Sequence, residues 1–299
     1  MAIRIGNAPV SWGIMEVAGW SGQQPYGEVL DEIARAGYVG TELGPYGYFP
    51  AEPAELQREL NARQLELVTA FVPIPLADPT AHEAGFVEAL NTAKLLAAAG
   101  ARSLLLADAM SQRRMAIAGR ADAARDGLSD EQWQHALALV ARIARACRAL
   151  GLAVSFHHHA GTFIETPAEI ARLLDGTEAE LLGLCLDTGH YFYGGGDPVE
   201  AVRQYGARIR HLHLKDVQPA VLDAVRQEGV DFLEAVRRSV FCELGQGAIA
   251  FPQIIQGLQT RGYDGWAIVE QDTDVNQPGV DPFASAVRSR QYLRTVIGI

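Results

Sequence analysis

Strand-like and helical hydrophobic patterns alternate along the whole chain. Apolar residues recur at helical spacing over residues 26–36, 82–99 and 131–150, which predicts three long helices. Apolar runs of strand length occur near residues 3–8, 39–44, 66–72, 103–107, 152–157, 183–187, 209–214 and 266–270. Runs such as SLLLA and LLGLCLD lack polar alternation, as is typical of parallel strands that are buried on both faces. Eight strand–helix units in 299 residues predict an α/β protein with a (β/α)8 TIM barrel.

Glycine stands at five of the predicted junctions between a helix and the next strand. It adopts the left-handed backbone conformation without strain, and it commonly follows the last residue of a helix. We therefore expect left-handed backbone at Gly37, Gly100, Gly151, Gly206 and Gly262.

A single barrel domain is expected to account for residues 1–299, because no Pro- or Ser-rich linker divides the chain. Two segments, near 109–128 and 218–238, exceed ordinary connection lengths and are expected to be insertions that form lids or contacts in a homo-oligomer. An apolar face of the second insertion could serve such an interface or the core. Its residues are Val221, Leu222, Val225, Phe232, Leu233 and Val236.

Composition and charge narrow the classes of partner. The chain is 48% apolar and 20% charged, with a net charge of −11. Nucleic acid and anionic membranes attract basic surfaces, so we expect neither as a partner, and a small molecule instead. The three cysteines form no CxxC pair, and no signal peptide or 18-residue apolar run is found, which predicts a cytoplasmic protein. Nucleotide-binding, serine-hydrolase and zincin motifs are absent.

Polar residues close most of the predicted strands. In a TIM barrel, residues at the carboxyl ends of the strands converge on one rim and form the active site. A mixed set of carboxylates and imidazoles suits Mn²⁺, Co²⁺ or Zn²⁺, so we expect a bound divalent ion. The candidates are Glu42, Asp108, His157, His158, His159, Asp187, His213 and Glu270.

Ordinary structural roles are the alternative for each candidate. A single carboxylate at a strand end can cap a helix or pair with an arginine. Asp197, which precedes Pro198, is the better helix cap of its loop, so we expect Asp187 to be free for other chemistry.

Alternation along the strands sorts the histidines by face. His211 and His213 lie on one side of their strand, and the intervening leucine lies on the other. His157 and His159 share a face that His158 does not. At least one of these three histidines is therefore expected to pack or to support a ligand.

Three further residues are candidates for substrate contact or for plain packing. Lys215 follows the predicted seventh strand and could be a solvated charge, a substrate hydrogen-bond donor or a proton carrier. Asn7 and Trp12 end the first strand, where an amide and an indole could wall a polyol pocket or pack in the core.

The chain resembles the xylose-isomerase-like TIM-barrel superfamily of sugar phosphate isomerases and epimerases, and within it most closely the inosose dehydratase branch. The resemblance spans nearly the whole length. It is carried by NAPVSWG at 7–13, HHHAGT at 157–162, LDTGHYFYGGGDP at 186–198, HLHLKDV at 211–217, VRQEGVDFLEAV at 225–236 and GYDGWAIVEQD at 262–272. It implies dehydration of a cyclic keto-polyol, 2-keto-myo-inositol (scyllo-inosose), in inositol catabolism.

The resemblance also implies a ligand set and an ion. Asp187, His213 and Glu270 match three metal ligands of the superfamily, with Mn²⁺ or Co²⁺ as the implied ion. Superfamily members normally place a glutamate at the end of the fifth strand, where this chain has His157. The fourth ligand is therefore His157, His159 or Glu165. Glutathione is also associated with the branch, and no residues can be assigned to it.

Roles in the reaction follow from the resemblance and from the chemistry of a metal-polarised ketone. Glu270, or a group near it, is expected to remove the α-proton, and Lys215 or His190 to assist departure of the β-hydroxyl. The expected substrate contacts are Asn7, Trp12, Glu42 and His159.

Three other functions are weighed against dehydration. A ketose epimerase or isomerase would share the fold and the ion, but it normally carries the strand-five glutamate that this chain lacks. A phosphodiester-cleaving nuclease is disfavoured by the net charge of −11. A non-catalytic sugar-binding protein would have no reason to keep the ligand residues.

Overall fold

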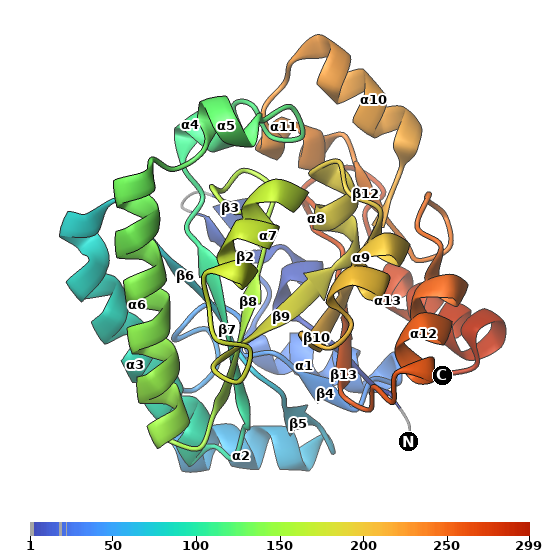
Figure 1. Cartoon of the computed structure of the whole chain (residues 1–299). Helices are drawn as coiled ribbons and strands as arrows, with labels where there is room; N and C mark the ends of the chain where they lie inside the picture. The colour runs from blue at the N-terminus through green and yellow to red at the C-terminus, as the bar shows by residue number, and fades with distance from the viewer. Residues whose placement is uncertain (1–2, 18–19, 22) are drawn as a thin grey trace.

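A ring of parallel strands forms the centre of the molecule (Figure 1). The computed structural model describes residues 3–17, 20–21 and 23–299. Strands of the main sheet follow the order β5-β4-β1-β13-β10-β9-β8-β7-β6, and every neighbouring pair is parallel. Their bounds are β1 (Arg4–Asn7), β4 (Gly40–Thr41), β5 (Glu66–Leu67), β6 (Phe71–Ile74), β7 (Ser103–Asp108), β8 (Ala153–His157), β9 (Leu182–Asp187), β10 (Ile209–Leu214) and β13 (Trp266–Val269).

The third barrel strand is split into β5 and β6, and together these pieces close the ring. β5 pairs with β4, and β6 pairs with β7. The residues between them continue both ladders, because the Val68 N–H donates to the Thr41 carbonyl (2.9 Å) and the Leu105 N–H donates to the Ala70 carbonyl (3.0 Å). The described strands of the main sheet therefore make eight barrel strands, and the predicted (β/α)8 TIM barrel is confirmed.

A helix follows each barrel strand in the described ranges. These are α1 (Tyr26–Arg35), α2 (Pro53–Ala62), α3 (His82–Ala98), α6 (Asp130–Ala149), α7 (Pro167–Asp175), α9 (Pro198–Tyr205), α12 (Phe251–Thr260) and α13 (Pro282–Tyr292). The three helices predicted from apolar spacing end within one residue of their predicted bounds. Among the described helices, none combines the length and the apolar character needed to cross a bilayer.

Four of the five junction glycines have the predicted left-handed backbone, and Gly206 does not. Its φ of −50° and ψ of −37° continue the right-handed turn of α9. A side chain at Gly206 would overlap Arg261 and would come within 2.7 Å of the Val202 carbonyl oxygen. Glycine is needed there for close packing rather than for its backbone freedom.

Short elements from the long connections gather at one end of the barrel, at the top of Figure 1. They are α4 (Gln112–Met115) and α5 (Ala123–Asp126) after β7, α8 (Thr188–Tyr193) after β9, and β11 (Asp216–Val217), α10 (Pro219–Glu228), α11 (Phe232–Arg237) and β12 (Phe241–Cys242) after β10. The remaining elements are η1 (Pro9–Trp12), β2 (Ile14–Val17), β3 (Trp20–Ser21), η2 (Pro79–Ala81) and the π-helical η3 (Leu293–Ile297).

The apolar face of the second insertion packs against the chain itself. Val225, Phe232 and Val236 are fully buried in one cluster with Tyr193 and Phe241. This face was predicted to serve either an interface or the core, and in the structure it packs in the core. A homo-oligomer and a single domain over residues 1–299 stay predictions.

Asp216, the first residue of β11, holds the loop that follows β12. Its carboxylate accepts the backbone N–H groups of Val217, Gly245, Gly247 and Ile249 at 2.9–3.0 Å. Asp216→Ala leaves the buried N–H groups among them without an acceptor, at about 1–3 kcal/mol each. We expect the free energy of unfolding, measured in urea, to fall by about 3 kcal/mol.

A matched control is Asp223→Ala, since Asp223 is exposed on α10. That variant should change the stability by less than about 0.5 kcal/mol. An Asp216→Ala protein as stable as the Asp223→Ala protein would contradict this role of Asp216.

Candidate active site

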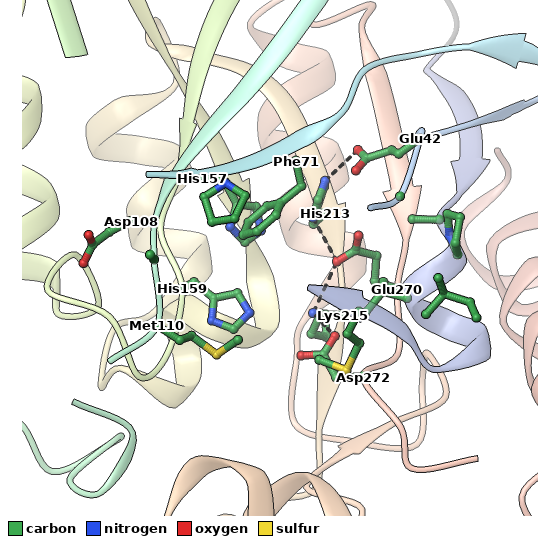
Figure 2. Close-up of a pocket in the computed structure, with 18 of the residues that line it drawn as sticks. Glu42, Phe71, Asp108, Met110, His157, His159, His213, Lys215, Glu270 and Asp272 are labelled. Atoms are coloured by element: carbon green, nitrogen blue, oxygen red, sulfur yellow. Dashed lines mark hydrogen bonds and ion pairs between the residues drawn. The ribbon is translucent and has the colours of Figure 1, made fainter. Parts of the chain in front are cut away.

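A cavity of about 290 Å³ opens at the carboxyl ends of the barrel strands. Titratable side chains and large apolar side chains both line it, and Figure 2 shows them. The titratable residues are Glu42, Asp108, His157, His159, His213, Lys215, Glu270 and Asp272. The apolar residues include Val10, Ile14, Met15, Phe71, Met110 and Met115.

Strand register brings four potential metal ligands together. His213 on β10 is paired with Asp187 on β9, so the two side chains share a face of the sheet. His157 on β8 is paired with Cys185, two residues before Asp187 on that face. Glu270 comes directly after β13. That strand pairs with β10 on the edge of β10 opposite to β9. One nitrogen or oxygen of each of these four buried residues lies within 4.8 Å of the others.

The donor atoms face one another in a way that suits a cation. His157 Nε2 lies 3.4 Å from Asp187 Oδ2, and His213 Nδ1 lies 3.0 Å from Glu270 Oε2. Within the described residues, His157 Nε2, Asp187 Oδ2 and His213 Nδ1 are buried without a hydrogen-bond partner. Buried polar atoms without partners are costly, and a bound ion would satisfy all three at once. Imidazole and carboxylate donors fit a divalent transition metal.

The two carboxylate oxygens of Asp187 have different roles. Oδ1 accepts the His190 N–H at 2.8 Å and caps α8, while Oδ2 faces His157 and His213. Asp197 caps the following helix, α9, as predicted, but the expectation that Asp187 is therefore free of a capping role is wrong. A carboxylate can do both, since capping needs only one oxygen.

Glu42 holds His213 in place from the side away from the cluster. Glu42 Oε1 lies 2.9 Å from His213 Nε2 and 3.1 Å from His211 Nε2, so both histidines face the same side of β10, as predicted. Burial alone would raise the pKa of Glu42, but the His213 and His211 imidazoles lower it. A carboxylate on the far nitrogen of a histidine fixes its tautomer and leaves the near nitrogen, Nδ1, for a metal.

Lys215 is a buried cation beside the cluster. Its Nζ lies 2.5 Å from Asp272 Oδ1, 3.2 Å from Glu270 Oε2 and 3.1 Å from His190 Nε2. Burial alone would lower the pKa of Lys215, but the carboxylates of Asp272, Asp187 and Glu270 raise it. Lys215 is therefore neither a solvated loop charge nor a neutral amine.

Sequence reasoning missed Asp272. It is buried at the end of the segment that follows β13, lines the cavity and accepts a hydrogen bond from Lys215. The signal was present, because Asp272 follows Glu270 by two residues and alternation places both on one face.

The three candidates for the fourth ligand lie in different surroundings. His157 belongs to the four-donor cluster, whereas His159 is grouped with His190 and Asp272. Glu165 lies elsewhere, since its two oxygens accept the N–H groups of Gly119 (2.6 Å) and Gly161 (2.7 Å). Glu165 therefore supports the first insertion and does not reach the cluster.

Two more strand-end residues have supporting positions. His158 turns away from the cavity, stacks edge-on against Tyr191 and accepts the Asp187 N–H at 3.3 Å. Asp108 lines the cavity apart from the cluster (Figure 2), and its oxygens accept the N–H groups of Leu76 and Phe163. Burial raises the pKa of Asp108 to about 7.

Asn7 and Trp12 do not line the cavity, so the prediction that they wall a substrate pocket is wrong. The Trp12 indole N–H donates to Glu32 on α1 at 2.6 Å, and Asn7 Oδ1 accepts the Ala8 N–H. The turn of η1 directs Trp12 outward and presents Ala8, Pro9 and Val10 to the cavity instead.

Comparison with known proteins finds relatives that match nearly the whole chain. The chain is 35% identical to an inosose dehydratase of Geobacillus kaustophilus over 98% of this chain and 94% of that relative. It is 36% identical to the rhizopine catabolism protein MocC of Rhizobium meliloti, over 93% of this chain and 84% of that relative. A solved structure of the IOLI protein with a binding zinc atom superposes with a TM-score of 0.70 at 13% identity, over 99% of this chain and 98% of that one.

These findings confirm the resemblance to the inosose dehydratase branch, since several relatives over nearly the full length bear that name. The model of the xylose isomerase-like TIM barrel family matches residues 30–296. The chain belongs to the xylose isomerase-like TIM barrel family.

Proposed function

We propose that this protein is a metal-dependent dehydratase of a cyclic keto-polyol, and that 2-keto-myo-inositol is its substrate in inositol catabolism. The observation that carries the proposal is the cluster of His157, Asp187, His213 and Glu270 at the cavity, with Lys215 beside it. Relatives named inosose dehydratase support the same reaction. The cavity of about 290 Å³ suits a single six-membered ring.

The four donors would hold the ion, and we propose Mn²⁺ or Co²⁺. Such an ion supplies polarisation of the ketone and electrostatic stabilisation of the enolate oxygen, worth several kcal/mol. The solved zinc-bound neighbour supports a divalent ion in this fold. His157 takes the position of the usual glutamate as a neutral ligand, because burial lowers its pKa. Glutathione has no role in the proposed reaction.

Proton removal is assigned to Glu270. Burial alone would raise the pKa of Glu270, but His213 and Lys215 lower it, so its carboxylate is ionised and able to accept a proton. The bond from the α-carbon to hydrogen breaks, and its electron pair forms the enolate. The Lys215 ammonium, 3.2 Å from Glu270, stabilises the negative charge near that carbon.

Departure of the hydroxyl completes the dehydration. The enolate electrons form the new carbon–carbon double bond while the β-carbon–oxygen bond breaks, and the leaving hydroxide takes a proton to become water. Lys215 and His190, with Nζ and Nε2 3.1 Å apart, form the proton-donating pair. His159 and Glu42 line the same cavity and are assigned to substrate hydroxyl contacts.

The decisive experiment incubates the purified protein with 2-keto-myo-inositol and measures product mass. Dehydration removes one water, whereas an epimerase or isomerase conserves the mass. In heavy water, an epimerase would add only exchanged deuterium. A product with the substrate's mass would replace the dehydratase proposal with the isomerase alternative.

Chelation is expected to abolish this activity. Removing the ion takes away several kcal/mol of transition-state stabilisation, or about 10³-fold in rate at 1.36 kcal/mol per factor of ten. Adding Mn²⁺ or Co²⁺ after removal of the chelator should restore turnover. Undiminished turnover of protein shown to be metal-free by elemental analysis would contradict a metal-dependent mechanism.

A further inference from the structure

A second group of ligand-type atoms lies beside the four-donor cluster. His159, His190 and Asp272 each offer one atom, all within 4.8 Å of one another and all buried. The rings of His159 and His190 lie with their centroids 3.7 Å apart and their planes tilted by 40°. In the described part of the chain, Asp272 Oδ2 is buried without a hydrogen-bond partner. This second group shares no residue with the first.

The ammonium of Lys215 lies between the two groups. From the second group it contacts Asp272 Oδ1 (2.5 Å) and His190 Nε2 (3.1 Å), and from the first it contacts Glu270 Oε2 (3.2 Å) and Asp187 Oδ2 (3.6 Å). An ammonium has three N–H donors, and two carboxylate oxygens, Asp272 Oδ1 and Glu270 Oε2, lie within 3.2 Å to accept from them. Lys215 thus has the surroundings of a cation held by carboxylates and an imidazole.

Packing fixes the stem of Lys215 so that Nζ reaches this position. The stem lies on Gly189, where a Cβ atom would come within 2.7 Å of Lys215 Cγ. The centroid of the Phe241 ring lies 5.2 Å from Nζ, and the ammonium sits over the face of that ring. Lys215 is only 1% exposed, so packing holds its ammonium in this place.

The position of this ammonium indicates what it does. Its Nζ lies 2.5–3.6 Å from carboxylate oxygens of Asp187, Glu270 and Asp272, so three carboxylates surround it as they would surround a bound cation. We propose that Lys215 occupies a second cation position and thereby limits the site to one divalent ion per chain. The inference rests on the metal site of the proposed function. Without the ammonium, His159, His190 and Asp272 would bind a second divalent ion.

The test is metal stoichiometry rather than activity. Wild type and the Lys215→Ala variant are dialysed against Mn²⁺, and the bound ion per chain is measured by elemental analysis and titration calorimetry. We expect one ion in wild type and two in Lys215→Ala. Two neighbouring Mn²⁺ ions should also give a coupled electron paramagnetic resonance signal that a single ion lacks.

The chain offers a matched control because it contains only two lysines, Lys94 and Lys215. Lys94 is exposed on α3, so Lys94→Ala removes the same charge far from the cavity and should keep one ion. Adding Asp272→Asn to Lys215→Ala should return the count to one. Should Lys215→Ala fail to fold, Lys215→Gln keeps most of the stem, removes the charge and carries the same expectation.

The outcomes separate this inference from the proposed function. One ion in wild type together with one ion in a folded Lys215→Ala or Lys215→Gln protein would overturn the role of Lys215 and leave the dehydratase intact. Two ions in wild type would also overturn it. A wild-type protein that binds no ion would overturn the metal site of the proposed function itself.

Discussion

Asp187→Asn should abolish metal binding while leaving the fold intact. Asparagine caps helices as well as aspartate does, so its amide oxygen can keep the hydrogen bond from the His190 N–H that Oδ1 accepts now. The amide nitrogen then takes the place of Oδ2, which faces His157 Nε2 at 3.4 Å. An amide nitrogen is no ligand for a divalent ion. Since the ion supplies several kcal/mol, we expect kcat/KM for dehydration to fall by about 10³-fold or more.

The measurements are bound metal by elemental analysis, unfolding by urea and kcat/KM by product mass. Asp197→Asn is the matched control, because Asp197 caps the exposed start of α9 through the Val199 N–H at 2.8 Å. It should retain metal and activity. An Asp187→Asn protein that holds its full complement of metal would show that Asp187 is not a ligand.

Strand ends were the part of the site that the sequence could predict. A buried strand followed by a carboxylate or an imidazole can be recognised in the sequence, and a parallel barrel brings the carboxyl ends of all its strands to one rim. This reasoning reached Glu42, His213 and Glu270, which line one cavity, and Asp187, which belongs to the same donor cluster as His213 and Glu270. Alternation also separated His158 from the cavity correctly.

Residues in the connections were harder to place, because turns rotate side chains in ways that alternation does not describe. The η1 turn reverses the expected direction of Trp12, and the indole reaches Glu32 on α1 instead of the cavity. Glu165 follows a strand, but its position is set by N–H groups of the first insertion that the sequence does not locate. The capping role of Asp187 depends on α8, a six-residue helix too short for its apolar spacing to show.

A buried ion pair of the first insertion could not be predicted from the sequence either. Arg114 on α4 donates to both oxygens of Glu169 at 2.8 and 3.1 Å, and neither side chain is exposed. These residues are 55 positions apart, and nothing in either sequence neighbourhood indicates the partner. Long-range pairs of this kind follow from the three-dimensional placement of the loops.

Glu270→Gln should stop dehydration at the first chemical step. The glutamine oxygen can still approach the ion, so bound metal at saturating Mn²⁺ should persist, but a neutral amide cannot accept the α-proton. General-base catalysis contributes about 10²–10⁴-fold, and kcat should fall by that factor. Exchange of the substrate α-proton with heavy water should fall equally, because proton removal precedes loss of the hydroxyl.

Exchange of the α-proton with heavy water distinguishes the residue that removes this proton from the residue that donates a proton to the leaving hydroxyl. A His190→Ala protein, impaired only in proton donation to the leaving hydroxyl, should retain exchange while losing dehydration. Glu243→Gln is the control for the substitution itself, since Glu243 pairs with Arg288 at 2.6 Å outside the cavity and should leave turnover unchanged. If Glu270→Gln keeps its metal and still turns over at the wild-type rate, the proton goes to another group. Asp272, which lines the cavity and whose Oδ1 and Oδ2 contact Lys215 and His190, is then the next carboxylate to test.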